Sequence, residues 1–183
     1  MLTSATLAHK AMHKRQSGIA MMEVLVTMVI FAIGALGLAA MQITSLKYNK
    51  DSAVRSKATL LSLELSDRMR ANMTAVKAGQ YTRNYGYATA STTIPTAPGC
   101  GTNATECTPA NMATLDLSDW TNDIARTLPG GAGALIPTAN NAAAFSIVVM
   151  WKEKALIDAN STDSLCPTPA VVGVRCLSTP FIP

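Results

Sequence analysis

The chain has 183 residues, of which 49% are hydrophobic and 14% are charged. That length suits one domain plus a membrane-anchoring segment, and the charged fraction is low against the ~25% of a soluble domain. The formal charge is +4, but three cations, Lys10, Lys14 and Arg15, precede Gly18 in a stretch without acids, so the rest of the chain carries only +1. This near-neutral remainder gives no support for nucleic-acid binding, which requires a basic patch on the folded part.

A polar, basic segment and a long apolar run open the chain. Residues 1–18 have no apolar core, whereas residues 19–41 form a run of 23 in which Glu23 is the only charge. About 20 apolar residues at ~1.5 Å each span a bilayer, and cations before such a run keep the N-terminus in the cytoplasm. We therefore predict a cytoplasmic leader over residues 1–18, the transmembrane half of a helix over residues 19–41, and an extracytoplasmic remainder.

A cleaved secretory signal peptide is the alternative interpretation of this region. Such a peptide has an apolar core of ~7–15 residues followed by an A-x-A-like site. The run here is longer than that, although Ala39 and Ala40 lie near its end. Its length favours the membrane helix.

The carboxylate inside the apolar run makes Glu23 a candidate functional residue. An acid in a membrane helix costs about 2.5–3.5 kcal/mol on insertion scales, and such residues generally have a partner. The positive end of the helix dipole also favours an acid near the helix start. We expect the partner to be a free α-amine at Ile19, from the same chain or a neighbour. The alternative is that Glu23, the fifth residue of the run, reaches the headgroup layer.

Helical periodicity continues well beyond the apolar run. Apolar residues recur at steps of three and four up to Val76, which is the period of one helix face. One helix from about residue 20 to 77 would be roughly 85 Å long, with residues 42–78 as its amphipathic half. We expect Gly79 to end it. The residues of the apolar face are Val54, Ala58, Leu61, Leu65, Met69, Met73 and Val76.

Residues 79–183 are predicted to form the extracytoplasmic globular domain. β-branched and aromatic runs indicate strands, and because short loops connect them we expect an antiparallel sheet. The amphipathic half of the helix would cover one face of that sheet, which makes the fold class α+β. The expected elements are an irregular loop at 81–114 with a short strand around 81–90, a helix at 116–128 capped by Asp116 or Ser118, strands at 133–137, 144–151 and 171–177, and a loop at 158–164.

Four cysteines, Cys100, Cys107, Cys166 and Cys176, follow the predicted membrane segment. An even number outside the cytoplasm favours disulfides, whereas structural zinc sites use pairs spaced C-x2–4-C, and these pairs are separated by six and nine residues. Four cysteines allow three connectivities. Because short loops close at the smallest entropy cost, we favour Cys100–Cys107 and Cys166–Cys176.

The distribution of polar residues argues against an enzyme. Both histidines precede Gly18, so a processed chain would contain none, and serine–histidine, cysteine–histidine or histidine–metal chemistry is excluded. Asp116, Asp119 and Asp123 are spaced three and four apart, and we interpret them as a solvated helical face with acids near the helix start rather than as a metal or acid/base site. We predict no catalytic residues, no metal and no cofactor.

The junction around Gly18 resembles the class III leader and mature N-terminus of type IV prepilins and type II secretion pseudopilins. The residues concerned are Lys14-Arg15-Gln16-Ser17-Gly18 followed by Ile19-Ala20-Met21-Met22-Glu23-Val24-Leu25-Val26. The resemblance implies that a prepilin peptidase cuts after Gly18 and methylates Ile19, and that Glu23 pairs with a neighbouring N-terminus during assembly. The usual first mature residue is Phe, so Ile19 is a departure, and the leader is longer than is common.

Residues 33–42, residues 58–61 and the string Asp67-Arg68-Met69-Arg70-Ala71-Asn72 resemble PilV-type minor pilins. Further along the chain, so do Trp120, Leu128-Pro129-Gly130-Gly131 and Val148-Val149-Met150-Trp151. That resemblance implies a long curved helix on an antiparallel sheet, and a low-abundance subunit that helps to initiate pilus assembly. Implied partners are other minor pilins, the major pilin, the prepilin peptidase and the inner-membrane assembly machinery. The implied location is the inner membrane in a single pass, and then the periplasm and pilus filament.

Alternatives remain open on these residues. A pseudopilin of a type II secretion system fits the same N-terminal junction, and an enzyme or binding protein tethered by an ordinary membrane helix is a third possibility. Arg68 and Arg70 are either solvated near the helix end, where the dipole favours cations, or Arg68 holds the following loop by hydrogen bonds to its carbonyls.

Overall fold

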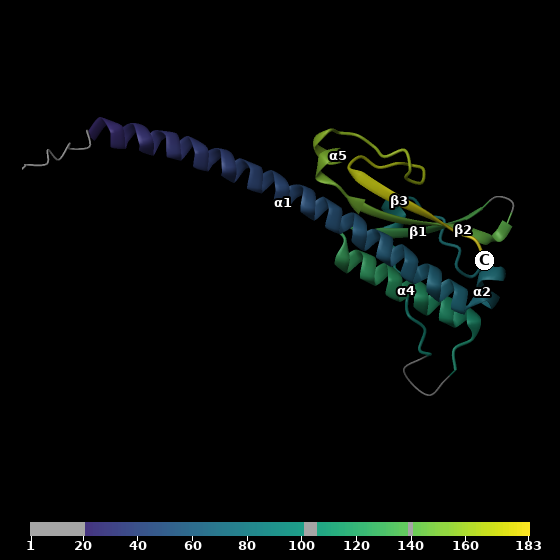
Figure 1. Ribbon diagram of the computed structural model, residues 1–183. Coiled ribbons are helices and arrows are strands. Elements are labelled where there is room, and N and C mark those ends of the chain that lie inside the picture. The colour runs from purple at the N-terminus through teal and green to yellow at the C-terminus, as the bar shows by residue number, and fades with distance from the viewer. Residues whose placement is uncertain (1–20, 101–105, 139–140) are drawn as a thin grey trace, which may run out of the picture. The chain divides into compact units, whose positions relative to one another are not determined.

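The computed structural model describes residues 21–100, 106–138 and 141–183, so the predicted leader lies outside the described residues. The chain divides into two compact units, one ending at Lys47 and the other comprising Tyr48–Pro183. The elements follow the order α1 (Met21–Ala71), α2 (Met73–Lys77), α3 (Tyr87–Ala90), α4 (Pro109–Thr127), β1 (Ala132–Thr138), β2 (Asn141–Lys152), α5 (Lys154–Asp158) and β3 (Val174–Phe181) (Figure 1).

The first unit is the N-terminal part of α1, and its side chains are exposed on every side. Residues 21–47 are all exposed, including large apolar side chains such as Phe31. The hydroxyls of Thr27 and Thr44 donate to backbone carbonyls within the helix, at 2.9 Å and 3.0 Å. With these two hydroxyls bonded within the helix and large apolar side chains on every side, this segment is suited to a lipid or protein environment rather than to water.

The long helix ends earlier than the periodicity predicts. The expected continuous helix to residue 77 is interrupted at Asn72, whose backbone leaves helical geometry (φ −120°, ψ 53°) between α1 and α2. Its side-chain amide donates to the carbonyl of Pro109 at 2.8 Å, so a long-range contact stabilises the break. Gly79 ends α2 as expected, with φ +71°, and the N–H groups of Gly79 and Gln80 bond back to the carbonyls of Val76 and Ala75.

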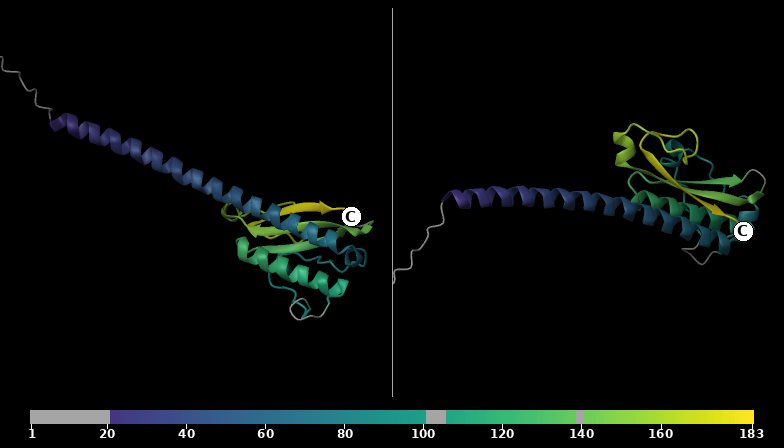
Figure 2. Two further views of the ribbon diagram at one scale, coloured as in Figure 1. Left: turned by 60° about the horizontal axis from the view of Figure 1, so that its bottom comes forward. Right: turned by 45° about the horizontal axis from the view of Figure 1, so that its top comes forward.

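Three antiparallel strands form the sheet in the order β1-β2-β3. Leu135 of β1 is opposite Ile147 of β2, and Val149 of β2 is opposite Leu177 of β3. Because side chains alternate along a strand, β2 presents one set of residues to each face of the sheet. The views in Figure 2 place α4 and the second half of α1 side by side against one of these faces.

Apolar side chains from α1, α4 and the sheet fill the main core. The α1 face that periodicity predicts is buried here, and full burial of each large apolar side chain contributes about 1.5–3 kcal/mol. The expected α+β architecture, with a long helix packed on an antiparallel sheet, is confirmed. Core residues include Ala58, Leu61, Leu65 and Met69 of α1, Leu117, Trp120 and Ile124 of α4, and Leu135, Phe145, Ile147, Val149 and Phe181 of the sheet.

Trp120 fixes the three layers of this core against one another. Its side chain is fully buried, and its indole N–H donates to the backbone carbonyl of Leu61 at 2.9 Å. A Cβ added at Gly133 would lie 2.4 Å from the indole ring, so the absence of a side chain there lets the ring lie directly on β1. Replacing Gly133 would therefore force α4 away from the sheet.

The helix preceding the sheet begins earlier than predicted. Thr108 caps α4, with its hydroxyl accepting from the N–H of Asn111 at 3.2 Å, and Pro109 occupies the first turn. The expected caps Asp116 and Ser118 are wrong, because both lie in the middle of α4 and are buried. The sequence around Pro109 suggested a loop, but proline is favoured at the first position of a helix.

Other boundaries also differ from the prediction. The strand expected around 81–90 is replaced by a single bridge between Arg83 and Leu135, followed by the short helix α3. Helix α5 was not predicted, because five residues are too short to show a helical period. The last strand begins at Val174 rather than residue 171, because Gly173 turns the chain with φ +79° and donates to the carbonyl of Ser161.

Candidate functional site

The N-terminal part of α1 carries the single carboxylate of the apolar run. Glu23 lies in the first turn of α1, is exposed, and pairs with no cation among the described residues. Gly18 and Ile19, the predicted cleavage and methylation residues, lie outside the described residues. The dipole of α1 favours an acid at this position, and the exposed carboxylate is accessible to a group from another chain.

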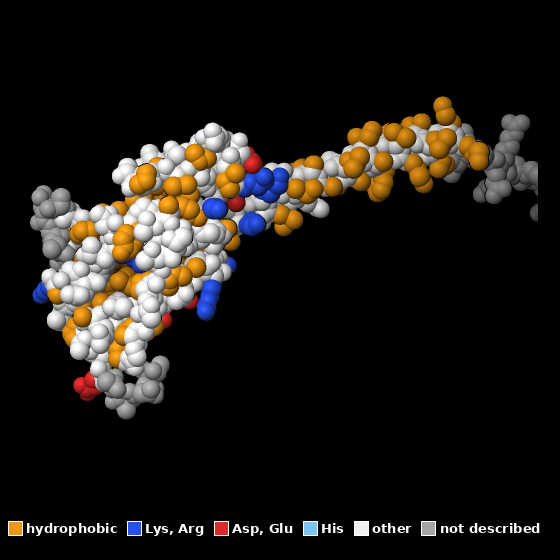
Figure 3. Space-filling view, turned by 180° about the vertical axis from the view of Figure 1, so that it is seen from behind, with side chains coloured by type: hydrophobic (Ala, Val, Ile, Leu, Met, Phe, Trp, Pro, Cys, Tyr) orange, Lys and Arg blue, Asp and Glu red, His pale blue; other side chains and the backbone are white. Residues whose placement is uncertain are grey.

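The surface around Glu23 is almost entirely apolar. By length and composition, α1 is a candidate membrane span, and none of its apolar window is buried. On the side of the molecule that Figure 3 displays, hydrophobic side chains occur along this part of the helix. A Cβ added at Gly34 or Gly37 would meet no atom within 4 Å, so both positions are open for another helix to approach. The large exposed side chains are Met21, Met22, Val24, Leu25, Val26, Met28, Val29, Ile30, Phe31, Ile33, Leu36, Leu38, Met41, Ile43 and Leu46.

The string at residues 67–72 joins the end of α1 to α4. Arg68 contacts Glu64 at 2.7 Å, Asp116 at 3.5 Å and Asp119 at 3.6 Å. Neither interpretation of Arg68 from sequence describes these contacts, because its half-buried guanidinium is held by carboxylates and bonds to no loop carbonyl among the described residues. Burial lowers the pKa of Arg68, but the hydrogen bond with Glu64 and the nearby aspartates raise it above its ordinary value.

Asp116 is the buried centre of this cluster. Its carboxylate accepts a hydrogen bond from the hydroxyl of Tyr81 at 2.5 Å, and Asn72 donates to the same hydroxyl at 3.3 Å. The interpretation of Asp116 as part of a solvated acidic face is wrong, whereas the side chain of Asp119 is half exposed. Burial and the bond to Asp116 raise the pKa of Tyr81, so the phenol stays protonated as a donor.

The remaining residues of the string divide between the core and the surface. Met69 is fully buried among the apolar core residues. Asp67 and Arg70 form an exposed pair at 3.1 Å, and the Arg70 guanidinium lies 5.8 Å from the centre of the Phe181 ring. The string therefore connects the helix end to α4, to Tyr81 and to the last strand.

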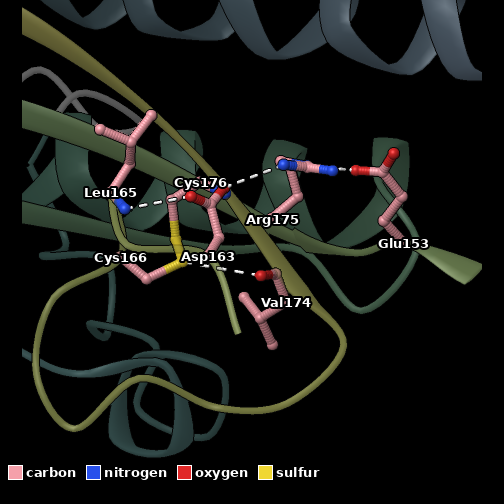
Figure 4. Close-up of a disulfide and its surroundings, with 7 residues drawn as sticks. All are labelled: Glu153, Asp163, Leu165, Cys166, Val174, Arg175 and Cys176. Atoms are coloured by element: carbon pink, nitrogen blue, oxygen red, sulfur yellow. Dashed lines mark hydrogen bonds and ion pairs between the residues drawn. A yellow bond between two sulfur atoms is a disulfide. The ribbon is translucent and has the colours of Figure 1, made fainter. Parts of the chain in front are cut away.

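A second polar cluster surrounds Glu153, and the sequence did not indicate it. The carboxylate of Glu153 contacts Arg175 at 2.5 Å, and Arg175 also contacts Asp163 at 3.5 Å (Figure 4). The same carboxylate contacts Arg55 of α1 at 3.4 Å. Arg55 and Glu153 are 98 residues apart, so no local spacing could have revealed the pair. We call Arg55, Glu153, Asp163 and Arg175 the Glu153 cluster.

The two carboxylates of the Glu153 cluster are held in their charged form. Burial raises the pKa of Glu153, but Arg175 and Arg55 lower it by a larger amount, so the net shift is downward. Burial also raises the pKa of Asp163, and the backbone N–H groups of Leu165 and Cys176, together with Arg175, lower it below its usual range. Each charge is therefore compensated where it is buried.

Two disulfides close short loops in the second unit. Cys100 and Cys107 are bonded, as are Cys166 and Cys176, and the Cα atoms are 5.2 Å apart in each pair. These are the two pairings that loop closure favours. The second bond ties the loop of Asp163 to β3, beside the Glu153 cluster (Figure 4).

Arg83 is a buried, charged residue that was not identified from the sequence. Its side chain is buried, and it donates to the carbonyls of Gly133 at 3.0 Å, Ala90 at 3.2 Å and Thr93. Burial lowers its pKa. Bonds to carbonyls of two segments give Arg83 a structural use, because they hold the loop after α2 against β1.

Comparison with known families accounts for much of the chain. Residues 40–118 match the family described as Type IV pilin Tt1218, and residues 13–39 match the prokaryotic N-terminal methylation motif. The two matches support a type IV pilin. They meet within α1, and the pilin family agrees with the helix-on-sheet architecture. Comparisons with curated proteins and with solved structures found no match.

The pilin matches indicate a structural, non-catalytic subunit. A prepilin leader implies processing by a prepilin peptidase and assembly with other pilins. The methylation motif and the apolar helix also fit anchoring in a membrane and a place in a pilus.

Proposed function

We propose that this pilin is a minor subunit of a type IV pilus that contributes to the initiation of pilus assembly. The observation that carries the proposal is the apolar part of α1, whose one carboxylate, Glu23, lies in its first turn directly after the methylation junction. The subunit waits in the inner membrane with its N-terminus in the cytoplasm, and then transfers α1 into a filament of like helices.

Processing creates the group that Glu23 needs. Cleavage after Gly18 would release an α-amine at Ile19, and an ammonium beside a carboxylate offsets the cost of both charges in an apolar filament. Exposure of Glu23 on α1 supports pairing with the N-terminus of a neighbouring subunit. Pairing of this kind would set the axial position of each incoming subunit.

The minor-pilin assignment rests on the resemblance of residues 67–72 to PilV-type proteins. The structure gives these residues a joint role at the α1–α4 junction, through Arg68, Met69 and Asn72. A pseudopilin of a type II secretion system is the second candidate, since the methylation motif is equally compatible with that class of protein. Copurification with pilus or with secretion components, tested with the full chain in its native membrane, separates the two.

The mature N-terminus is the first test. Mass spectrometry of the chain recovered from membranes should show a start at Ile19 carrying a methyl group. An intact Met1, or a start near Ala40, would contradict the pilin proposal and favour a tethered protein or a secreted one.

Replacing the carboxylate is the second test. We expect Glu23→Ala to reduce incorporation into filaments about ten-fold or more, because 1.4 kcal/mol already corresponds to a factor of ten and an unpaired amine costs more. Cleavage after Gly18 should be unchanged. Quantitative immunoblotting of sheared filaments against membranes measures both, with Asp51→Ala as the matched control, since Asp51 is an exposed acid of α1 beyond the apolar run. Normal incorporation of Glu23→Ala would contradict the assembly role.

A further inference from the structure

A group of basic residues follows the apolar part of α1 directly. Lys47, Lys50 and Lys57 are exposed and form no ion pair within the described residues, whereas Arg55 is paired with Glu153. Asp51 is the only acid between residues 24 and 63. Three ammonium groups on this stretch of helix therefore lack a partner in the described chain.

Helix geometry gives the depth of these lysines in a bilayer. The hydrocarbon core is about 30 Å thick, or about 40–45 Å with both headgroup layers. At ~1.5 Å per residue, a core that begins just after Glu23 ends near Ile43. Each headgroup layer is thus about 5–7.5 Å thick. Lys47 then lies about 6 Å beyond the hydrocarbon, within that layer. Lys50 lies about 10 Å beyond it, a few ångströms outside the layer, but its side chain is inclined toward the N-terminal, membrane end of the helix. Lys57 lies about 21 Å beyond it, outside the headgroup layer.

The neighbouring residue supports this placement. Tyr48 is 72% exposed and lies between the two lysines, and aromatic residues with a polar tip are enriched at the interface of membranes. Lysine side chains also extend along the helix to reach the headgroups with their ammonium groups. The stretch 47–50 combines the two residue types that anchor a helix at a lipid surface.

We propose that Lys47 and Lys50 bind the headgroups of anionic phospholipids where α1 leaves the bilayer. The proposal rests on the membrane-anchored stage of the proposed function. An anionic lipid surface attracts nearby basic residues by about 1 kcal/mol each, which corresponds to about five-fold in affinity. An acidic protein partner fits less well, because Lys47 lies at headgroup depth beside Tyr48, and Lys50 lies three residues further with its side chain inclined toward the membrane. The contact holds the subunit at a fixed depth before assembly and is lost when α1 leaves the membrane.

Lipid selectivity tests the proposal. The full chain is reconstituted into vesicles of phosphatidylcholine and phosphatidylglycerol, and its association with spin-labelled forms of each lipid is compared by electron paramagnetic resonance. The wild-type chain should prefer phosphatidylglycerol, and the double variant Lys47→Gln/Lys50→Gln should lower that preference by up to about five-fold per lysine. Added salt should weaken the wild-type preference in the same direction.

Lys57→Gln is the matched control, with the same charge change on the same helix about 15 Å beyond Lys47. It should retain the wild-type preference. An equal loss in Lys57→Gln, or no loss in the double variant, would overturn the proposal. So would a double variant that keeps its lipid preference but loses an acidic protein partner on copurification. Cleavage after Gly18 is measured on the same samples, so a failed lipid contact is distinguished from a chain that is not a pilin.

Discussion

Asp116 is a polar residue of the core on which the stability of its neighbours depends. Its carboxylate is buried in α4, accepts from Tyr81 at 2.5 Å and contacts Arg68 at 3.5 Å. Burying a carboxylate is unfavourable unless hydrogen bonds and a cation compensate it. Tyr81 and Arg68 supply both, so the three side chains depend on one another.

We expect Asp116→Ala to lower the free energy of unfolding by about 2 kcal/mol, because it removes a hydrogen bond to a charged group and leaves the Tyr81 hydroxyl short of a partner. Chemical denaturation of the full chain in detergent measures this. Asp119→Ala is the control, since Asp119 contacts the same Arg68 at 3.6 Å but is half exposed, and an exposed pair contributes only about 0.2–1 kcal/mol. Equal losses in the two variants would contradict the role given to Asp116.

Acid should destabilise the Glu153 cluster. The pKa values of Glu153 and Asp163 are lowered in the folded chain, so protons bind the unfolded chain more tightly. Their contribution to stability is therefore complete above the ordinary carboxyl pKa of about 4 and is lost as the pH falls below it. Thermal unfolding measured between neutral and acidic pH should show this decrease, and Glu153→Gln should show a smaller one. An unchanged pH dependence in Glu153→Gln would contradict the assignment.

At the scale of elements, both edges of the sheet are closed to a further strand. On β1, Leu135 exchanges backbone hydrogen bonds with Arg83, and two residues further along the same edge Pro137 has no N–H. On β3, the outward N–H of Cys176 donates to the side chain of Asp163 at 3.2 Å, and four residues further Pro180 has no N–H. Covered donors and prolines are common means of preventing edge-to-edge pairing.

Opening one edge should promote self-association. Pro180→Thr supplies an outward N–H and a β-branched side chain on β3, so we expect the chain to associate more strongly as its concentration rises. Light scattering in detergent, compared with Ser178→Thr on the same strand, measures this. A monodisperse Pro180→Thr chain at all concentrations would show that other features protect the edge.

The sequence predicted those elements whose pattern is local. Apolar continuity indicated the first half of α1, and strand β2 follows from a β-branched and aromatic run. The start of α4 at Pro109 and the break at Asn72 were missed, because a cap by Thr108 and a bond to a distant carbonyl decide them. Glu23 was identified as a candidate functional residue from its apolar surroundings. The partners of Arg68 and Glu153 were not, since they come from segments brought together only by folding.

At the scale of the whole molecule, α1 takes part in both units. Its first part is exposed and apolar, and its second part is held in the folded domain by polar contacts as well as by the core. Among the described residues, such contacts occur at three positions along the helix: Arg55 with Glu153, the carbonyl of Leu61 with Trp120, and Arg68 with Asp116 and Asp119. They are six and seven residues apart, or about 10 Å per interval.

The spacing of these three contacts has a mechanical consequence. Each contact joins α1 sideways, either to α4 or to Glu153 at the end of β2. A machine that draws α1 along its own axis therefore loads all three contacts at once and in shear. Bonds loaded in parallel share the force, whereas bonds loaded one after another break in turn. The folded domain is thus attached to its helix by contacts that share the load, so tension along α1 does not separate them one at a time.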